Sequence, residues 1–308
     1  MPDYRQNLPW YQSRLFLCHV GFETDLIFNK NIDLPSFALF PLLETEAGRA
    51  TLDDGYRGLL EIARNAGLGL QLDSPTWMAN KDRARDLGYS PDDLVEINKE
   101  SIAFLDSVRR TYGDCPTVLS ANVGPRSDAY APADRMTVDE AEAYHSDQVS
   151  VLVDTATDVV TAMTLAYTEE ATGIVKAARR NNLPVVISFT VELDGRLPTG
   201  TPLKDAITRV DEETDGYAEH FTINCAHPDH FADVMNDVTQ TGRLRGIIAN
   251  ASRCSHAELD EAEVLDDGDP LELAGQLLNL QNSYPSIFML GGCCGTDLRH
   301  IGEIAARV

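Results

Sequence analysis

Three cysteines at the ends of two short apolar segments are the residues best suited to chemistry in this 308-residue chain. Cys225 ends one segment, and the adjacent pair Cys293 and Cys294 follows two glycines at the end of the other. Three thiolates around Zn2+ leave one tetrahedral position open, as in catalytic zinc sites. Sulfur ligands disfavour Mg2+ and Ca2+, and a thiol that takes the open position loses its proton and becomes a nucleophile. The three cysteines therefore predict a catalytic zinc site for a small thiol.

Other interpretations of the cysteines stay open at this point. Adjacent cysteines could serve redox chemistry, although no Cys-x-x-Cys occurs in the chain and vicinal cysteines form strained disulfides. Cys254 could replace one of the three ligands. Cys18 and Cys115 are interpreted as small buried apolar residues.

The segments that must position these cysteines alternate between two kinds. Short apolar or β-branched runs, typical of buried parallel strands, are each followed by a longer segment with helical spacing. The runs cover residues 14–20, 67–73, 117–124, 158–164, 184–191, 220–226, 245–251 and 286–293. Helices over 94–111 and 141–156 follow cap signals that begin at Ser90 and Thr137.

Eight such units predict a single (β/α)8 barrel over residues 1–308. A doubly wound sheet is the second choice, because no Gly-x-Gly-x-x-Gly follows a predicted strand. In a parallel barrel the residues at the carboxyl ends of the strands converge. Cys225 ends the sixth run and Cys293 the eighth, so we expect their side chains to meet. Gly291 and Gly292 are expected to let the chain turn sharply, and Gly295 to let a helix begin at once.

Composition excludes several classes of partner. The chain has 49 Asp and Glu against 25 Lys and Arg, a formal net charge of −24, so nucleic acid and anionic membranes are not expected partners. Residues 1–13 lack the apolar core of a signal peptide, and no stretch is apolar enough to cross a membrane. We therefore expect a cytoplasmic, reducing location and free thiols. The acidic run 258–269 is expected to be a solvated loop or helix edge.

Several motifs together resemble one enzyme family. They are Gly21-Phe22-Glu23-Thr24, Ser74-Pro75-Thr76-Trp77, Asn122-Val123-Gly124-Pro125-Arg126, Ser188-Phe189-Thr190-Val191-Glu192 with Asp194-Gly195-Arg196-Leu197-Pro198, Ile223-Asn224-Cys225, and Gly291-Gly292-Cys293-Cys294-Gly295-Thr296. This set is similar to the zinc-dependent homocysteine S-methyltransferases. The resemblance implies that the three cysteines bind zinc and that homocysteine thiolate takes the open position. A sulfonium or ammonium donor then gives up a methyl group to form methionine.

The resemblance also implies a substrate-binding set and two partners, a small thiol and a methyl donor. The oligomeric state is left open, and no side chain is expected to act as a general acid or base. Trp77 could lie against a cationic donor or belong to the core, and Asn250 could approach the amino acid or form a turn. The substrate-binding residues expected are Gly21, Phe22, Glu23, Asp73, Thr76, Trp77, Asn122, Met163, Asn224 and Asn250.

Two departures from the family pattern affect the acceptor. Relatives usually carry Asp-Gly-Gly after the first strand, where this chain has His19, Val20 and Gly21. Betaine-type relatives place a Glu at the end of the fourth strand, where this chain has Met163. Both changes remove an anion that would hold an ammonium group, which Asp73 or Glu23 could replace. Methyl transfer to a different small thiol, or a non-catalytic zinc- or thiol-binding barrel, are therefore the alternative functions.

Overall fold

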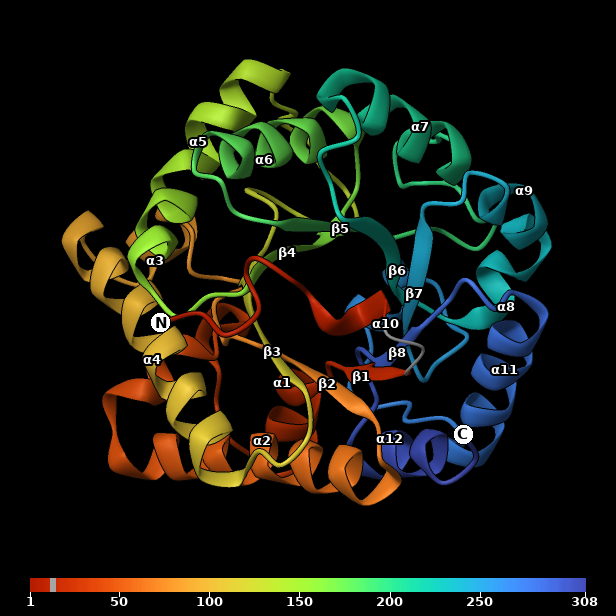
Figure 1. Ribbon diagram of the computed structural model, residues 1–308, viewed down its shortest axis with the longest axis horizontal. Helices are drawn as coiled ribbons and strands as arrows, with labels where there is room; N and C mark the ends of the chain where they lie inside the picture. Colours follow the sequence, from red (N-terminus) through yellow and green to blue (C-terminus); the bar gives the residue numbers. More distant parts are fainter. Residues whose placement is uncertain (12–14) are drawn as a thin grey trace.

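Eight parallel strands close into a barrel in their sequence order in the computed structural model, which describes residues 1–11 and 15–308 (Figure 1). The strands are β1 Phe16–Cys18, β2 Gly69–Asp73, β3 Thr117–Val123, β4 Val159–Leu165, β5 Val185–Phe189, β6 His220–Ala226, β7 Leu244–Ala249 and β8 Met289–Gly292. Each falls on one of the predicted runs. The first predicted run begins at Arg14, which lies outside the described residues. The (β/α)8 prediction is confirmed.

Helices surround the barrel and cover its outer face (Figure 1). The α-helices are α1 Phe22–Thr24, α2 Glu46–Ala66, α3 Lys81–Asp86, α4 Pro91–Tyr112, α5 Val138–Val151, α6 Thr168–Arg180, α7 Leu203–Thr214, α8 Pro228–Phe231, α9 Met235–Thr239, α10 His256–Asp260, α11 Pro270–Ser283 and α12 Leu298–Ala305. Single turns of other helix types are η1 Pro9–Tyr11, η2 Asp25–Asn29, η3 Pro35–Phe37, η4 Phe40–Glu44, η5 Leu152–Asp154 and η6 Ala232–Val234. In the described part of the chain, no helix combines the length and the apolar character needed to span a bilayer.

Local signals account for where α4 and α5 begin. Ser90 and Thr137 are the N-cap residues, and each forms the reciprocal capping box with the acidic residue three positions later. The prediction for the second helix was too long, because α5 ends at Val151 and the chain tightens into η5 before turning at Thr155. The Thr155 hydroxyl donates to the carbonyl of Leu152, which competes with further helix.

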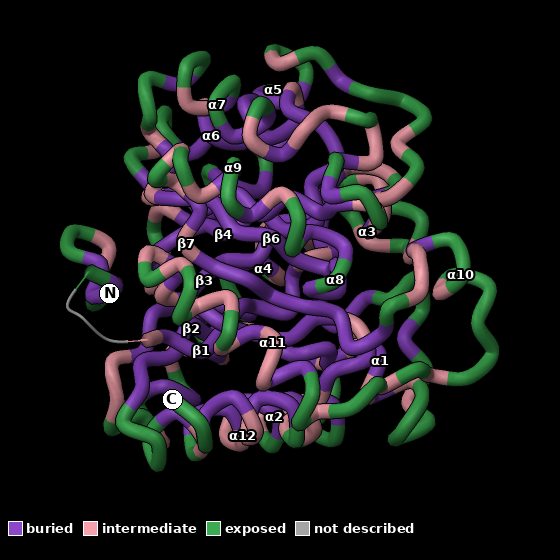
Figure 2. Tube along the Cα trace, turned by 90° about the vertical axis from the view of Figure 1, so that its right-hand side faces the viewer, coloured by how far each residue is buried: buried purple, intermediate pink, exposed green. Residues whose placement is uncertain are grey.

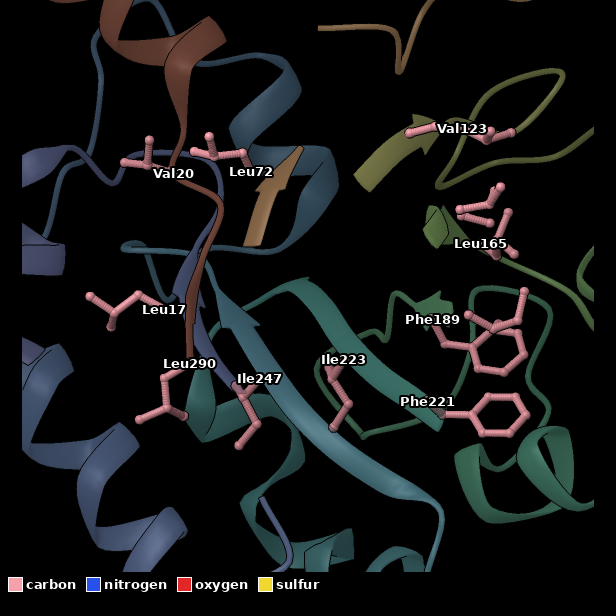
Figure 3. Close-up of a cluster of buried hydrophobic side chains, with 14 of the residues drawn as sticks. Leu17, Val20, Leu72, Val123, Leu165, Phe189, Phe221, Ile223, Ile247 and Leu290 are labelled. Atoms are coloured by element: carbon pink, nitrogen blue, oxygen red, sulfur yellow. The ribbon is translucent and has the colours of Figure 1, made fainter. Parts of the chain in front are cut away.

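Two apolar layers lie on opposite faces of the strands. Successive side chains of a strand alternate between faces, so Leu17 points toward the helices while Phe16 and Cys18 point into the barrel. Figure 3 shows the outer layer, in which Ile223, Ile247 and Leu290 from neighbouring strands pack together. Trp10 in η1 packs edge to face on His220 at the start of β6, with ring centroids 4.7 Å apart, and covers the amino end of the barrel.

Candidate metal centre

The three predicted cysteines come together at the carboxyl end of the barrel. Their sulfur atoms all lie within 4.8 Å of one another, and Cys225 Sγ is 3.5 Å from Cys294 Sγ. Strand β7 alone separates β6, which carries Cys225, from β8, after which the cysteine pair follows. Cys225 and Cys293 are buried and Cys294 is half-buried. Cys254 does not belong to this group, so the structure gives no support for Cys254 as a ligand.

A bulge in β6 directs Cys225 toward the other two sulfurs. The pairing of β6 with β7 shifts register between Asn224 and Ala226, and Cys225 has a left-handed backbone with φ of 56°. Thr164 in β4 has the same rare conformation, with φ of 63°. The Asn224 side chain joins the two strands, because its Oδ1 accepts from the Thr164 backbone N–H at 2.8 Å. A backbone of this kind costs about 1–3 kcal/mol per residue and is concentrated at functional sites.

The glycines before the cysteine pair serve a different purpose from the one predicted. Gly291 and Gly292 lie within β8 and do not form a turn. A Cβ at Gly291 would collide with the backbone carbonyl of Cys18 in the neighbouring β1. Gly291 therefore permits close approach of the β1 and β8 backbones, and a Cβ at Gly292 would collide with the side chain of Thr296. Gly295 has φ of 79°, and the next helix begins only at Leu298, after the N-cap Asp297.

The three sulfurs are electrostatically coupled. Hydrogen bonds from Cys293 and Cys294 hold the pKa of Cys225 well below its ordinary value. The same contacts with Cys225 raise the pKa of Cys293 and of Cys294 well above theirs. Three negative charges this close would repel one another, so the three thiols do not all ionise without a compensating cation. A bound divalent metal ion would allow all three to ionise, because coordination deprotonates a thiol outright. Three sulfurs with an open side toward a cavity fit zinc with one free position.

A tyrosine that the sequence did not indicate contacts this group. The hydroxyl of Tyr130 lies 2.9 Å from Cys225 Sγ. Burial raises the pKa of Tyr130 well above its ordinary value, so the phenol stays protonated. A thiolate at Cys225 has no proton, so the Tyr130 hydroxyl is the donor when Cys225 is ionised. Its ring stacks on His256, with centroids 4.0 Å apart, and His256 Nε2 lies 2.6 Å from the carbonyl oxygen of Cys225.

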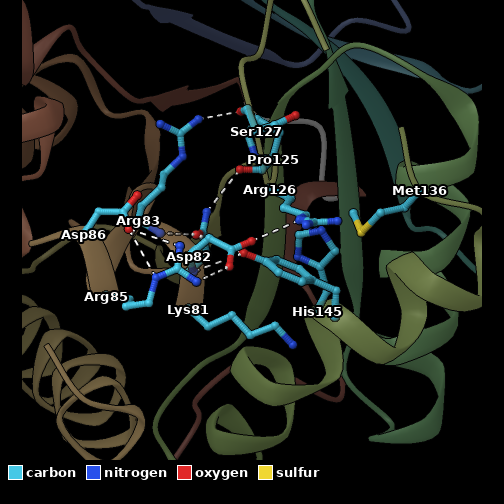
Figure 4. A network of polar contacts seen from close by, with 12 residues as sticks. Lys81, Asp82, Arg83, Arg85, Asp86, Pro125, Arg126, Ser127, Met136 and His145 are labelled. Atoms are coloured by element: carbon cyan, nitrogen blue, oxygen red, sulfur yellow. Dashed lines mark hydrogen bonds and ion pairs between the residues drawn. The ribbon is translucent and has the colours of Figure 1, made fainter. Parts of the chain in front are cut away.

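The irregular loop that carries Tyr130, residues 124–137, is fixed at both ends. Figure 4 shows the network at its start, where Arg126 pairs with Asp82 at 3.0 Å. The Arg126 backbone N–H donates to Glu170 at 2.8 Å, and buried His145 contacts the same carboxylate at 3.0 Å. At the far end the Met136 N–H donates to the Tyr167 hydroxyl. Nothing in the spacing of the sequence predicts these contacts, since each partner comes from a different helix or loop.

A cavity of about 740 Å³ opens beside the sulfurs. Residues expected at the substrate site that line it are Gly21, Glu23, Trp77, Asn122, Met163, Asn224 and Asn250. Burial raises the pKa of Glu23. Trp77 Nε1 donates to the backbone carbonyl of Met163 at 3.2 Å. Among the residues that the structure describes, none hydrogen-bonds the buried side-chain oxygens of Asn122 and Asn250, which is unusual for buried polar atoms.

Three other expected substrate residues lie outside the lining. Phe22 packs on Tyr56, with centroids 5.1 Å apart, and Thr76 donates its hydroxyl to the Asn122 carbonyl at 2.8 Å. Asp73 lies behind His19, which does line the cavity, and the two are 3.5 Å apart from Oδ2 to Nδ1. Burial opposes protonation of His19, but the hydrogen bond and charge of Asp73 outweigh burial and raise the pKa of His19.

The acidic run 258–269, which was predicted to be a solvated edge, also contributes residues to the cavity. It forms the end of α10 and the segment after it, at the outer edge of the barrel (Figure 2). Leu259, Ala262 and Leu265 line the cavity, together with Val264, which is 77% exposed. The run therefore borders the mouth of the site.

Comparison with known families identifies the family to which the chain belongs. A family model described as homocysteine S-methyltransferase matches residues 71–308. The chain belongs to this family of methyl-transferring enzymes, as its motifs predicted. The match begins in β2, so the segment from His19 to Thr24 lies outside the matched residues. A search of curated proteins finds no match.

Solved structures of one protein share the fold over nearly its whole length. The homocysteine methyltransferase MmuM from Escherichia coli in its oxidized form has a TM-score of 0.78 at 19% sequence identity, over 99% of this chain and 100% of that one. The metallated form of the same protein has a TM-score of 0.75 at 18% identity, over 98% of this chain and 99% of that one. At this level of identity the likeness demonstrates a common fold.

Proposed function

We propose that this chain transfers a methyl group from a small sulfonium or ammonium donor to homocysteine, giving methionine, with Zn2+ held by Cys225, Cys293 and Cys294. The observation that carries the proposal is the group of three sulfurs within 4.8 Å at the edge of a large cavity, in a chain of this family. The E. coli homocysteine methyltransferase, which shares this fold, has been solved in a metallated form, and this supports a metal ion in the present chain.

Zinc bound here would supply one piece of chemistry, which is to ionise the substrate thiol near neutral pH. The protein's own residues would align the reactants. Asn122, Asn250 and Glu23 line the cavity, and among the described residues nothing hydrogen-bonds the side-chain oxygens of the two asparagines. These groups suit the ammonium of an amino-acid thiol. They could replace the anions that relatives carry where this chain has His19 and Met163.

The charge of the cavity favours a cationic donor. Its lining has more acidic than basic groups: Glu23, Asp82, Asp86, Asp128, Asp260 and Asp266 against Arg83 and Arg126. The face of Trp77 adds a cation-π surface worth about 0.5–2 kcal/mol. A methyl group on such a donor leaves by in-line displacement, and the donor departs as a neutral molecule. The reaction therefore needs alignment and a thiolate but no proton donor.

Methyl transfer to another small thiol is the second candidate. It is favoured by His19, whose contact with Asp73 places a group of raised pKa where relatives have an acid. A protonated imidazole would attract a carboxylate and not an ammonium group. We also propose a reducing compartment such as the cytoplasm, because the three thiols must stay reduced to bind metal.

The test is metal content followed by turnover. Protein purified with reductant should hold about one zinc per chain, the stoichiometry of a single three-cysteine site. It should also form methionine from homocysteine with S-methylmethionine, betaine or S-adenosylmethionine, each offered separately. Protein that binds no zinc under these conditions contradicts the proposal. Zinc without methionine, but with methylation of another thiol, supports the second candidate.

A further inference from the structure

The proposed reaction creates a problem of selectivity, because three cysteine thiolates lie beside the thiolate that is to be methylated. All are sulfur nucleophiles within reach of the same cavity. Resting on the proposed function, we propose that Tyr130 protects Cys225 from methylation by donating a hydrogen bond to its sulfur. The methyl group then goes to the substrate and not to the protein.

The contact is specific to one of the three sulfurs. Tyr130 Oη lies 2.9 Å from Cys225 Sγ, and both residues line the cavity. The side-chain amide of Asn224 lies 4.0 Å from Cys293 Sγ, which is a much weaker contact. Cys294 is the most exposed of the three and has its sulfur contact with Cys225. Tyr130 therefore distinguishes Cys225 from its neighbours.

A hydrogen bond of this kind lowers reactivity. It stabilises the thiolate, and a more stable thiolate is a weaker nucleophile. Hydrogen bonds to charged groups are about twice as strong as neutral ones. The step that it slows is attack of Cys225 Sγ on a methyl carbon. A carbon–sulfur bond forms, the bond from methyl to its leaving group breaks, and the leaving group keeps the electron pair. The product is a neutral thioether, which is a poor zinc ligand compared with a thiolate.

The surroundings of Tyr130 keep its hydroxyl in place. His256 stacks on the ring and also contacts the Cys225 carbonyl oxygen, so one imidazole positions both partners. The Asp128 side chain accepts from the N–H of Tyr130 at 2.7 Å, which fixes the turn just before it. The loop contacts from Arg126 and Met136 complete this support.

The experiment uses iodomethane as the methylating agent on zinc-loaded protein without homocysteine. Because iodomethane requires no donor site and no acceptor thiol, the result does not depend on whether the chain makes methionine. Methylation of each cysteine is followed over time by peptide mass mapping, and zinc release is measured in parallel. Tyr130→Phe removes the hydroxyl and keeps the ring. Tyr167→Phe is the matched control, because its hydroxyl holds the same loop through Met136 but does not touch a sulfur.

We expect iodomethane to methylate Cys225 at least about tenfold faster in Tyr130→Phe than in the unchanged protein. This is the size of effect expected for losing a hydrogen bond to a charged group. Rates at Cys293 should change little, and zinc release should follow Cys225 methylation. With S-methylmethionine as the methylating agent, Cys225 should likewise be methylated faster in Tyr130→Phe than in the unchanged protein. An unchanged Cys225 rate in Tyr130→Phe overturns the proposal, and so does an equal increase in Tyr167→Phe. Faster methylation of Cys225 than of Cys294 in the unchanged protein would overturn it as well.

Discussion

Buried polar groups are used differently at the two ends of this barrel. At the amino end, the side chain of Asp158 is fully buried and accepts from the backbone N–H groups of Asp3, Tyr4 and Leu119 at 2.7–2.9 Å. The guanidinium of Arg109 also donates to it at 2.9 Å. This carboxylate is satisfied by the protein itself, and it joins the N-terminal segment to the barrel.

At the carboxyl end, some buried acceptors are left unpaired. In the described part of the chain, the side-chain oxygens of Asn122 and Asn250 have no hydrogen-bond partner. Cys225, Thr164 and His19 adopt left-handed backbones there, although none is glycine. Unpaired acceptors and strained residues cost stability, and such residues are concentrated at functional sites. Unpaired buried groups also occur at the amino end, at Trp10 and His220, so the carboxyl end is set apart by its left-handed residues within β4 and β6 and by the cavity beside them. We therefore expect variants at the two ends to have opposite consequences.

The largest effect is expected at the metal centre. Cys225→Ala leaves two sulfurs, and we expect zinc affinity to fall by more than about 100-fold, beyond the range for outer residues of a metal site. Methyl transfer should be lost with the metal. Cys254→Ala is the control, because Cys254 lies outside the group. Zinc content by atomic emission and methionine formation are the measurements. Full zinc in Cys225→Ala would exclude Cys225 as a ligand.

At the amino end, a large effect on stability without an effect on binding is expected. Asp158→Asn leaves the buried Arg109 without this partner, and we expect the free energy of unfolding in urea to fall by about 3 kcal/mol. Asp3→Asn, at the exposed edge of the same network, should cost less than about 1 kcal/mol. KM for the thiol should not change in either variant. A change in KM would show that the two ends are not independent.

Asn250→Ala should behave in the opposite way. The variant removes an unpaired buried acceptor, so the free energy of unfolding should not fall, while KM for the thiol rises about tenfold. Asn181→Ala, which removes an amide bonded to the Ala177 carbonyl near the end of α6, is the control and should leave KM unchanged. If Asn250→Ala instead destabilises the protein and leaves KM intact, Asn250 has a structural role.

A smaller, pH-dependent effect is expected from His220 at the amino end. Burial lowers the pKa of His220 to about 3, against 6.5 for a free histidine. The unfolded chain therefore binds a proton that the folded protein does not, and stability falls as the pH drops from about 6.5 toward 3. His220 contributes up to about 1.4 kcal/mol per pH unit. Urea unfolding at several pH values should show a shallower dependence in His220→Leu, and parallel curves would contradict this account.

Much of the fold could be predicted because its local signals are strong. The strands are short apolar runs, and the capping boxes at Ser90 and Thr137 mark where α4 and α5 begin. The proximity of Cys225 to the Cys293–Cys294 pair could also be predicted from the topology, because the carboxyl ends of parallel strands lie on one side of a barrel. For these features, local sequence and global fold agree.

Other parts of the site depend on contacts that no local pattern encodes. Cys225 and Thr164 take left-handed backbones at positions where the sequence has no glycine, and the side chain of Asn224 in β6 accepts from the Thr164 backbone in β4. Tyr130 reaches Cys225 through an irregular loop whose path is set by distant groups such as Glu170. The placement of Phe22 on Tyr56, away from the cavity, likewise follows from packing between helices and not from its motif.

The most direct test of the central claim is zinc X-ray absorption on the zinc-loaded protein with and without homocysteine. The account predicts three sulfur neighbours at about 2.3 Å and one lighter atom in the free protein. With homocysteine, a fourth sulfur should replace the lighter atom. A zinc ion whose sulfur count does not change when homocysteine is added would contradict the claim that the three-cysteine group binds and activates this thiol.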